Sequence, residues 1–400
     1  MKVLLVHNFY GSAAPSGENQ VFEAERALLQ LRGHEVAEFT RHSDEIRDPG
    51  TWGNIKGAAA TPWNPWAAEA IQRAVARFLP DVVHVHNTFP LISPSIFHAL
   101  AGTGVARVLT LHNYRLFCPA AIPMRAGQVC TDCLDRRSVL PALQHGCYRH
   151  SRLATVPLAI NVALHRAAGT WSHQVDAFIA LTEFQRQRVV DAGLSASRVF
   201  VKPNFYPGNP TVVPWAQRMP YVVFAGRLTA EKGVATLLRA WQLWGPHAPE
   251  LRVLGDGELR NKLETMAVGL PVRFLGQLTS KDAEQQIAES CLLVLPSEWY
   301  EGFPMVLREA FAFGTPAAVS DLGPLPSIVK NGINGVVFDS SNPEALLHEV
   351  RKIWSSPGVL EKMGGAARVA FDEKYTAESN YKQLALIYMH AMQQVNNINS

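Results

Sequence analysis

Two patterns of apolar positions alternate along the chain. Short apolar runs that end at turn residues predict buried strands, and the longer segments between them repeat apolar positions at helical spacing. The strands expected in the first half are residues 2–7, 35–39, 82–86, 107–111 and 177–181. Those expected in the second half are residues 221–225, 251–254, 272–275, 292–295, 317–319 and 335–338. This alternation predicts α/β domains in which helices cover parallel sheets.

Residues 202–214 interrupt the pattern with four prolines and one glycine. Proline fixes φ and removes a backbone donor, so we interpret this segment as an interdomain linker without regular structure. A chain of 400 residues also exceeds what one hydrophobic core usually organises. We therefore expect two domains, residues 1–203 and 204–375, and a terminal helix over 376–400 that is long enough to cross back onto the first domain.

Composition indicates which kinds of binding partner and which cellular compartment to expect. The 37 Lys and Arg residues exceed the 34 Asp and Glu residues by only three, which excludes nucleic acid as the expected main partner. Residues 1–8 lack the length and cleavage pattern of a signal peptide, and no apolar run reaches the length of a membrane span. Five cysteines in such a chain favour the cytoplasm over a disulfide framework.

Two carboxylates stand eight residues apart in the second half. Glu301 lies in a loop broken by Gly302 and Pro304, and Glu309 lies in the apolar helix that follows. Two acceptor-only carboxylates suit the two hydroxyl-rich ends of a sugar nucleotide, and the helix N-terminus between them suits its diphosphate. Taken alone, the pair is also consistent with a solvated loop Glu and an ordinary helix Glu.

Six short motifs follow one another in the second half. They are Phe224-Ala-Gly226-Arg227 through Lys232-Gly233, Leu254-Gly-Asp-Gly257, Phe274-Leu275-Gly276, Pro296-Ser297, Glu301 to Glu309, and Gly314-Thr-Pro316. This series resembles the retaining glycosyltransferases of family 4, and six motifs in order are far more specific than one. The first half matches more loosely, at Ser16-Gly17, Gly33-His-Glu-Val and Leu111-His112-Asn113. The resemblance implies the GT-B architecture, in which two Rossmann-like domains face one another across a cleft.

The resemblance also implies roles for single residues. Arg227 and Lys232 would bind the donor diphosphate, Glu309 the ribose, and Glu301 a hydroxyl of the donor sugar. The donor-binding set would further include Gly17, Gly226, Gly302, Phe303, Pro304, Met305, Val306 and, beside the nucleobase, Arg273, Phe274, Leu275 and Gly276. Pro304 departs from the family, which commonly has glycine there, and so removes one N–H donor.

His112 would contact the donor sugar and assist the reaction, so that the expected catalytic residues are His112, Glu301, Arg227 and Lys232. A satisfied buried histidine is the alternative for His112, and it applies even more to His84 and His86. Since no Asp-Xaa-Asp occurs in the sequence, no metal or other cofactor is expected for catalysis.

The reaction implied by the resemblance is transfer of a hexose, with retention of anomeric configuration, from a nucleotide-diphosphate sugar to a hydroxyl of a glycan or lipid-linked glycan. Two other functions remain open on the sequence. One is a nucleotide-sugar epimerase of the same fold, and the other is a non-catalytic partner that binds sugar nucleotides.

Four cysteines lie close together in the first half. Cys118, Cys130, Cys133 and Cys147 include a Cys-x-x-Cys pair, which predicts a structural zinc site. The outer spacings match no standard zinc finger, so four unlinked thiols are an equal alternative.

A basic stretch follows the cysteines. Residues 136–173 contain five arginines and no Asp or Glu, and the apolar positions of residues 153–164 have helical spacing. Such a segment can lie on an anionic bilayer at the inner face of the membrane and offer arginine to a lipid pyrophosphate. The alternative is an ordinary core-facing helix with a basic rim.

Overall fold

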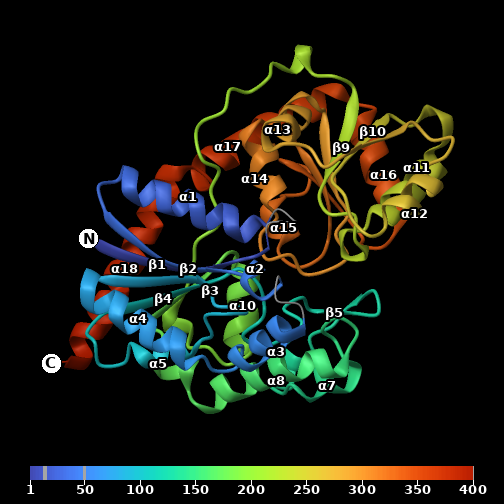
Figure 1. Cartoon of the computed structure of the whole chain (residues 1–400). Helices are drawn as coiled ribbons and strands as arrows, with labels where there is room; N and C mark the ends of the chain where they lie inside the picture. Colours follow the sequence, from blue (N-terminus) through green and yellow to red (C-terminus); the bar gives the residue numbers. More distant parts are fainter. Residues whose placement is uncertain (12–15, 48–50, 400) are drawn as a thin grey trace. The chain divides into compact units, whose positions relative to one another are not determined.

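A computed structural model describes residues 1–11, 16–47 and 51–399. The chain forms two compact units. The first unit comprises Met1–Pro123, Thr131–Pro203 and Asn380–Ser400, and the second comprises Met124–Cys130 and Asn204–Ser379. Each unit contains a six-stranded parallel sheet with helices packed on it, as the sequence pattern predicts (Figure 1).

The first sheet has the strand order β2-β1-β3-β4-β7-β8. Its strands are β1 (Lys2–Phe9), β2 (Glu35–His42), β3 (Val82–Asn87), β4 (Ala106–Leu111), β7 (Ala177–Ala180) and β8 (Val199–Val201). All neighbouring pairs are parallel, with Lys2 opposite Glu35 and Val3 opposite Val82 in the two pairs that β1 makes. Five of the six strands match the sequence prediction, and the sixth, β8, is only three residues long.

The second sheet has the order β11-β10-β9-β12-β13-β14. Its strands are β9 (Tyr221–Ala225), β10 (Glu250–Leu254), β11 (Val272–Gly276), β12 (Leu292–Leu295), β13 (Ala317–Ser320) and β14 (Gly335–Phe338). All six were expected at these positions, because strands buried on both faces read as continuous apolar runs. Residues 202–214 contain neither helix nor strand, as their prolines predict.

The helices of the first unit pack on its sheet or on one another. They are α1 (Gly17–Leu31), α2 (Asp44–Arg47), α3 (Thr51–Ala60), α4 (Pro65–Phe78), α5 (Ser95–Ala99), α6 (Asp132–Asp135), α7 (Leu140–His145), α8 (Arg152–Ala167), α9 (Thr170–His173), α10 (Glu183–Asp191) and η1 (Ala196–Arg198). The terminal helix α18 (Ala377–Asn399) packs on the same sheet, because Leu384, Tyr388 and Ala391 share a core with Val3 and Leu5 of β1.

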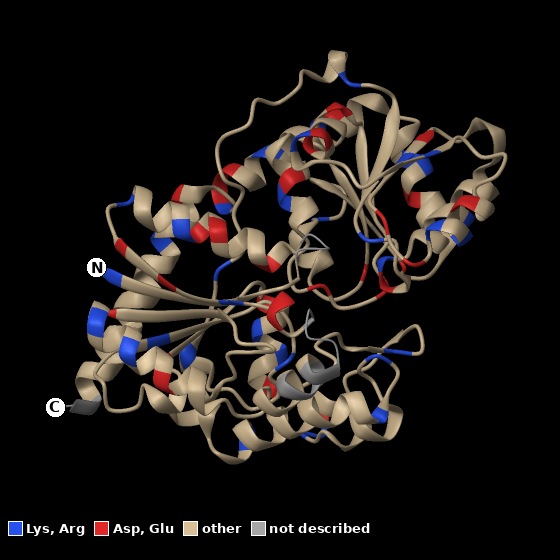
Figure 2. Cartoon of the chain, in the orientation of Figure 1, with Lys and Arg blue, Asp and Glu red and all other residues tan. Residues whose placement is uncertain are grey.

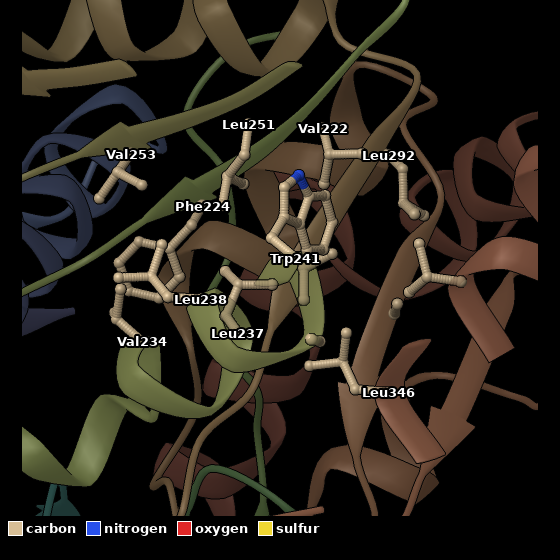
Figure 3. Close-up of a cluster of buried hydrophobic side chains, with 14 of the residues drawn as sticks. Val222, Phe224, Val234, Leu237, Leu238, Trp241, Leu251, Val253, Leu292 and Leu346 are labelled. Carbon is tan, nitrogen blue, oxygen red and sulfur yellow. The ribbon is translucent and has the colours of Figure 1, made fainter. Parts of the chain in front are cut away.

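The helices of the second unit surround its own core. They are η2 (Trp215–Gln217), η3 (Ala230–Lys232), α11 (Val234–Trp244), η4 (Gly245–His247), α12 (Arg260–Met266), α13 (Ser280–Glu289), α14 (Met305–Ala312), α15 (Leu325–Ile328), α16 (Pro343–Trp354) and α17 (Pro357–Lys374). Trp241 of α11 is fully buried among Leu237, Leu251 and Leu292 (Figure 3). Its ring N–H donates to the Pro249 carbonyl at 2.8 Å, so burial leaves this polar group satisfied. The remaining strands, β5 (Met124–Arg125) and β6 (Gln128–Val129), form a short antiparallel hairpin.

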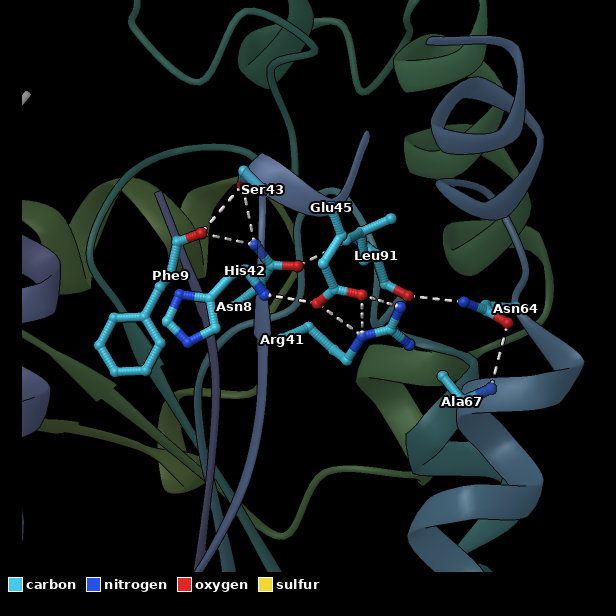
Figure 4. Close-up of polar contacts among 9 residues, drawn as sticks. All are labelled: Asn8, Phe9, Arg41, His42, Ser43, Glu45, Asn64, Ala67 and Leu91. Carbon is cyan, nitrogen blue, oxygen red and sulfur yellow. Dashed lines mark hydrogen bonds and ion pairs between the residues drawn. The ribbon is translucent and has the colours of Figure 1, made fainter. Parts of the chain in front are cut away.

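Buried asparagines hold the loops at the carboxyl edge of the first sheet (Figure 4). Asn8 of β1 donates to the Phe9 carbonyl and the Ser43 hydroxyl at 3.0 Å each, and it accepts from the Leu91 N–H at 3.1 Å. Asn64 caps α4 by accepting from the Ala67 N–H at 3.1 Å, and it donates to the Leu91 carbonyl. These bonds fix the backbone that follows β1, β2 and β3, where a ligand crevice is expected.

Candidate functional site

The second sheet changes direction between β9 and β12. The chain continues from β9 to β10 on one side of this pair and from β12 to β13 on the other. The connections that follow β9 and β12 therefore lead to opposite sides of this pair, and ligands of doubly wound sheets bind at such a point. Lys232 lies in the loop after β9, and Glu301 lies in the loop after β12.

Lys232 and Glu301 meet at this point. The Lys232 ammonium donates to Glu301 Oε1 at 2.7 Å, and the Ser297 hydroxyl donates to the same oxygen at 2.7 Å. Glu301 is 4% exposed, and the ammonium also lies 5.3 Å from the centre of the Trp299 ring. Because both bonds end on Oε1, Oε2 is the oxygen that a ligand hydroxyl would meet.

Close backbone contacts hold the two loops together. Gly233 has a φ of +69°, and a Cβ there would lie 1.8 Å from the Pro296 carbonyl oxygen, so only glycine fits. The Glu298 N–H donates to the Glu231 carbonyl at 2.9 Å, and the Thr236 hydroxyl donates to the Glu298 carboxylate at 2.6 Å. The two loops that carry Lys232 and Glu301 are therefore held in place by contacts with each other.

Arg227 differs from Lys232 in its surroundings. Its side chain is 60% exposed, and its guanidinium lies 3.3 Å from the Glu231 carboxylate. Because the guanidinium is largely exposed, its ion pair with Glu231 is weak, and a ligand anion can compete for it.

Helix α14 carries the second carboxylate of the motif. Met305 and Val306 form its first turn, and Pro304 precedes it with a φ of −73°. Glu309 lies in the second turn, where burial raises the pKa of its carboxyl and nearby Glu284 raises it further, against the effect of Arg308. Burial likewise lowers the pKa of the Arg308 guanidinium to about 10. Ligand-free, this helix therefore holds a carboxylate that lacks full solvation.

Residues 273–276, which the resemblance places beside the nucleobase, belong to β11, an edge strand of the second sheet. Backbone bonds join the carboxyl ends of β9, β10 and β11: the Gly226 N–H donates to the Leu254 carbonyl at 3.0 Å, and the Gly255 N–H donates to the Gly276 carbonyl at 2.8 Å. The Arg273 side chain is exposed and pairs with Glu250 at 3.5 Å, so it makes no contact with Glu301 among the residues described.

In the first unit, His112 follows β4 and belongs to a chain of buried groups. Its Nε2 lies 3.1 Å from His86 Nδ1, and His86 Nε2 lies 3.5 Å from the Glu25 carboxylate. Burial lowers the pKa of His112 to about 3, and it lowers the pKa of His86 well below its usual value. Both rings are therefore neutral near pH 7.

The buried carboxylate favours one arrangement of protons in this chain. A proton on His86 Nε2 faces Glu25, which leaves His86 Nδ1 to accept from His112 Nε2–H. His112 Nδ1 is then an acceptor for a ligand hydroxyl.

Glu25, His84 and His86 also offer ligand atoms within 4.8 Å of one another, as a metal site would. The Lys202 ammonium, however, is bonded to the Glu25 carboxylate. Both ring nitrogens of His84 are engaged as well, with the Tyr388 hydroxyl at 2.7 Å and the Thr110 hydroxyl at 2.8 Å. The lysine thus supplies the positive charge that Glu25 needs, and this group fits an internal ion pair better than a metal ion.

A cavity of about 50 Å³ lies beside His86 and His112. Its polar lining includes Asn87, Asn113 and Asn161. Glu18, in the first turn of α1, accepts from the Asn113 amide at 2.8 Å, and burial raises the pKa of its carboxyl. Gly17 begins α1, whereas residues 12–15 of the preceding loop lie outside the described residues.

The four cysteines divide between the units. Cys118, Cys133 and Cys147 belong to the first unit, and Cys130 ends the β5–β6 segment assigned to the second. Burial raises the pKa of the Cys118 thiol to about 12, and nearby Cys133 and Cys147 raise it further. The zinc site stays a prediction.

The sequence analysis missed several buried polar residues of these sites. They are Glu18, Glu25, Lys202 and Arg308, whereas Ser297 was found as part of a motif but was given no role. Glu25 had a readable signal, because it falls on the apolar face of α1 with Val21, Phe22, Leu28 and Leu29. A charge on a buried face implies a partner.

Two family models match consecutive parts of the chain. The model described as Glycosyltransferase Family 4 matches residues 17–207, and the model described as Glycosyl transferases group 1 matches residues 209–370. Together they cover most of the chain in the expected order. The chain belongs to glycosyltransferase family 4.

Curated relatives of this family 4 glycosyltransferase match in part. An uncharacterized glycosyltransferase of Methanocaldococcus jannaschii is 33% identical over 43% of the chain and 45% of its own length. A sulfoquinovosyl transferase of Arabidopsis thaliana is 26% identical over 75% of the chain and 55% of its own length. The chain thus spans about half the length of these two relatives.

Solved structures match the family 4 glycosyltransferase over nearly its whole length. A glycosyltransferase from Rickettsia africae has a TM-score of 0.70 at 14% identity and covers 98% of both chains. Anabaena HepE in complex with UDP and glucose has a TM-score of 0.64 at 16% identity and covers 96% of this chain and 98% of its own. These likenesses confirm the predicted GT-B fold. None of the helices in the described ranges is long and apolar enough to cross a bilayer.

Proposed function

We propose that the chain is a retaining glycosyltransferase that moves a hexose from a nucleotide-diphosphate sugar to a hydroxyl of a glycan or lipid-linked glycan. The observation that carries the proposal is the Lys232–Glu301 pair, which stands at 2.7 Å where the second sheet changes direction. A cation and a carboxylate on braced loops, beside a helix N-terminus, suit the diphosphate and the sugar of one ligand.

Each charged residue of the proposed donor site has a partner on the nucleotide sugar. Lys232 and Arg227 neutralise the diphosphate, whose negative charge grows as the glycosidic bond breaks, so they act mainly on the transition state. Glu301 accepts from a sugar hydroxyl, and Glu309 accepts from the ribose hydroxyls. Anabaena HepE, solved in complex with UDP and with UDP and glucose, supports a nucleotide sugar as donor.

Two protein cations replace a metal clamp in this proposal. No Asp-Xaa-Asp occurs in the sequence to hold one. The bond from the anomeric carbon to the phosphate oxygen breaks, and the acceptor oxygen bonds to that carbon on the same face, which retains the anomeric configuration. The leaving phosphate oxygen takes the proton of the acceptor hydroxyl. His112, held neutral by burial, accepts from a hydroxyl of the donor sugar through Nδ1 and orients it.

The name of one relative supports the acceptor class. It is a GDP-mannose-dependent phosphatidylinositol dimannoside mannosyltransferase of Mycobacterium tuberculosis, 33% identical over 34% of this chain and 36% of its own length. This name describes a lipid-linked glycan acceptor.

The test compares Lys232→Ala with Lys262→Ala, which changes an exposed lysine of α12. A thermal-shift screen with UDP-, GDP- and ADP-sugars first identifies the donor, because a bound ligand raises apparent stability. Lys232→Ala is then expected to lower kcat/KM for donor turnover at least tenfold, or about 1.4 kcal/mol of transition-state stabilisation, while Lys262→Ala leaves it unchanged. Equal rates in the two variants would remove Lys232 from the site, and wild-type protein that binds a donor without turnover would favour the non-catalytic alternative.

A further inference from the structure

Helix α8 of the first unit presents apolar side chains on two opposite faces. Leu158, Ala159 and Val162 are buried in the core of the unit. The outward side chains are Leu153, Val156, Ile160 and Leu164, which are 85%, 38%, 49% and 37% exposed. Spacings of three and four residues place these four side chains on one stripe of the helix.

The outward stripe lacks the polar cover that a surface helix normally has. Thr155, Asn161 and His165 are buried, so the polar side chains of α8 that reach the surface are Arg152 and Arg166. Ala163 and Ala167 are also exposed. In the neighbouring helix α7, Leu140 is 61% exposed (Figure 1). An exposed apolar stripe of this kind marks a contact site more often than a surface left to solvent.

The charged residues around the stripe favour an anionic partner. No Asp or Glu occurs from residue 136 to residue 173, and the exposed arginines of this stretch are coloured blue in Figure 2. Arg149 and Arg152 flank the N-terminus of α8, where the helix dipole disfavours a cation. Basic charge at that end therefore costs stability in the free protein, and a surface of negative charge offsets this cost.

We propose that the outward stripe of α8, with Leu140, docks on an anionic lipid bilayer. The leucine, isoleucine and valine side chains enter the boundary between headgroups and acyl chains, and Arg136, Arg149 and Arg152 contact lipid phosphates. This docking does not depend on the proposed transferase activity. It would bring the first unit to the surface where a lipid-linked acceptor resides.

The first experiment is co-sedimentation of the full chain with vesicles of phosphatidylcholine alone or mixed with phosphatidylglycerol. We expect binding to the anionic vesicles only, and weaker binding as salt rises, because the field of the lipid charges is screened within a Debye length. Wild-type protein that ignores anionic vesicles at low salt overturns the proposal.

Variants separate the apolar and the basic contributions. The double substitution Leu153→Ser and Ile160→Ser is expected to reduce anionic-vesicle binding at least tenfold, and Arg149→Gln with Arg152→Gln to reduce both the binding and its salt dependence. The matched controls are Val268→Ser, at a residue 80% exposed in the second unit, and Arg73→Gln with Arg77→Gln on α4. Equal binding by the α8 variants and the controls overturns the proposal.

Two further measurements test whether the substitutions unfold the protein and whether the stripe binds a second copy of the chain instead. Because the substituted side chains are exposed, no variant should melt below wild type, and the arginine variant should melt at or slightly above it because it relieves the unfavourable charge at the helix N-terminus. Hydrogen exchange in α8 should slow only when anionic vesicles are present. Sedimentation velocity tests the other occupant of an apolar stripe. A wild-type dimer that Ile160→Ser dissociates, without vesicle binding, would assign the stripe to a second copy of the chain.

Discussion

Single residues of the second unit combine poor solvation with a proposed ligand contact. Burial raises the pKa of Glu309, so its ionised form is destabilised in the folded, ligand-free protein. The destabilisation is absent below the unfolded pKa near 4.5, grows as the pH rises from there toward the folded pKa, and is complete above it. A ribose that donates two hydroxyl bonds would replace the lost solvation.

Glu309→Gln should therefore raise the melting temperature of the ligand-free protein at pH 7 to 8, an advantage that shrinks as the pH falls toward 4.5. The same substitution should weaken nucleoside diphosphate binding at least tenfold, or about 1.4 kcal/mol. Calorimetric scans over pH and a binding titration check the two effects. Glu301→Gln is the comparison, since it should impair sugar transfer more than binding of the sugar-free nucleotide, and equal loss of nucleotide affinity in both variants would contradict the assigned roles.

His86 provides the second prediction at this scale. If Glu25 and His86 set the proton position on His112, replacing His86 by Asn should alter the tautomer of His112. Nitrogen chemical shifts of the His112 ring report this change directly, and kcat should fall while the donor KM changes little. Unchanged His112 shifts would show that the ring takes its tautomer from another neighbour.

Secondary-structure elements explain how the loops of the second unit stay in place. Helix α11 starts one residue after Gly233, whose φ of +69° turns the chain from η3 into the helix. The missing Cβ lets the Pro296 carbonyl approach, so the loops after β9 and β12 pack together without a side chain between them.

Gly233→Ala should destabilise the protein by about 2 kcal/mol or more, because it adds both a strained φ and a collision with backbone. It should also weaken donor binding, since Lys232 would move with the loop. Gly358→Ala is the matched control: a Cβ there meets nothing within 4 Å, and alanine in the first turn of α17 should stabilise by about 0.5 kcal/mol. Urea unfolding of both variants provides the comparison, and similar stabilities would argue against the close packing of these loops.

The sequence predicted strands better than polar partners. All eleven expected strands are strands in the structure, because a parallel strand that is buried on both faces has a continuous apolar sequence. The three-residue strand β8 is too short for such a signal. The ion pair of Glu25 and Lys202 joins residues 177 positions apart, and no local pattern specifies that distance. Lys232 and Glu301 were found because a family series marks them, and their direct bond emerged only from the fold.

At the scale of the whole molecule, the histidines with lowered pKa values are unevenly distributed. His7, His34, His84, His86, His98, His112 and His165 have lowered pKa values, chiefly through burial, and all belong to the first unit. The second unit contains His247 and His348. The two units should therefore respond differently to acid.

Each of these seven histidines has a folded pKa below its unfolded value of 6.5, so unfolding takes up protons in acid. Their stabilising contribution is complete above that pH and is lost as the pH falls toward the folded values, which are about 4 for His7 and about 3 for His112. Hydrogen exchange at decreasing pH should show loss of protection in the first sheet before the second. Simultaneous loss in both sheets, or earlier loss in the second, would contradict this expectation.

The path of the chain between the two units determines where a chimera with a relative can be spliced. Residues 380–400 return to the first unit, where Leu384, Tyr388 and Ala391 cover apolar residues of β1. The second unit is therefore largely an insertion between Pro203 and Asn380, not an appended module. A fragment that stops at Pro203 would expose the face of the first sheet that α18 protects. An exchange of donor specificity with a relative should consequently splice at both boundaries and keep the native C-terminal helix with its own N-terminal half.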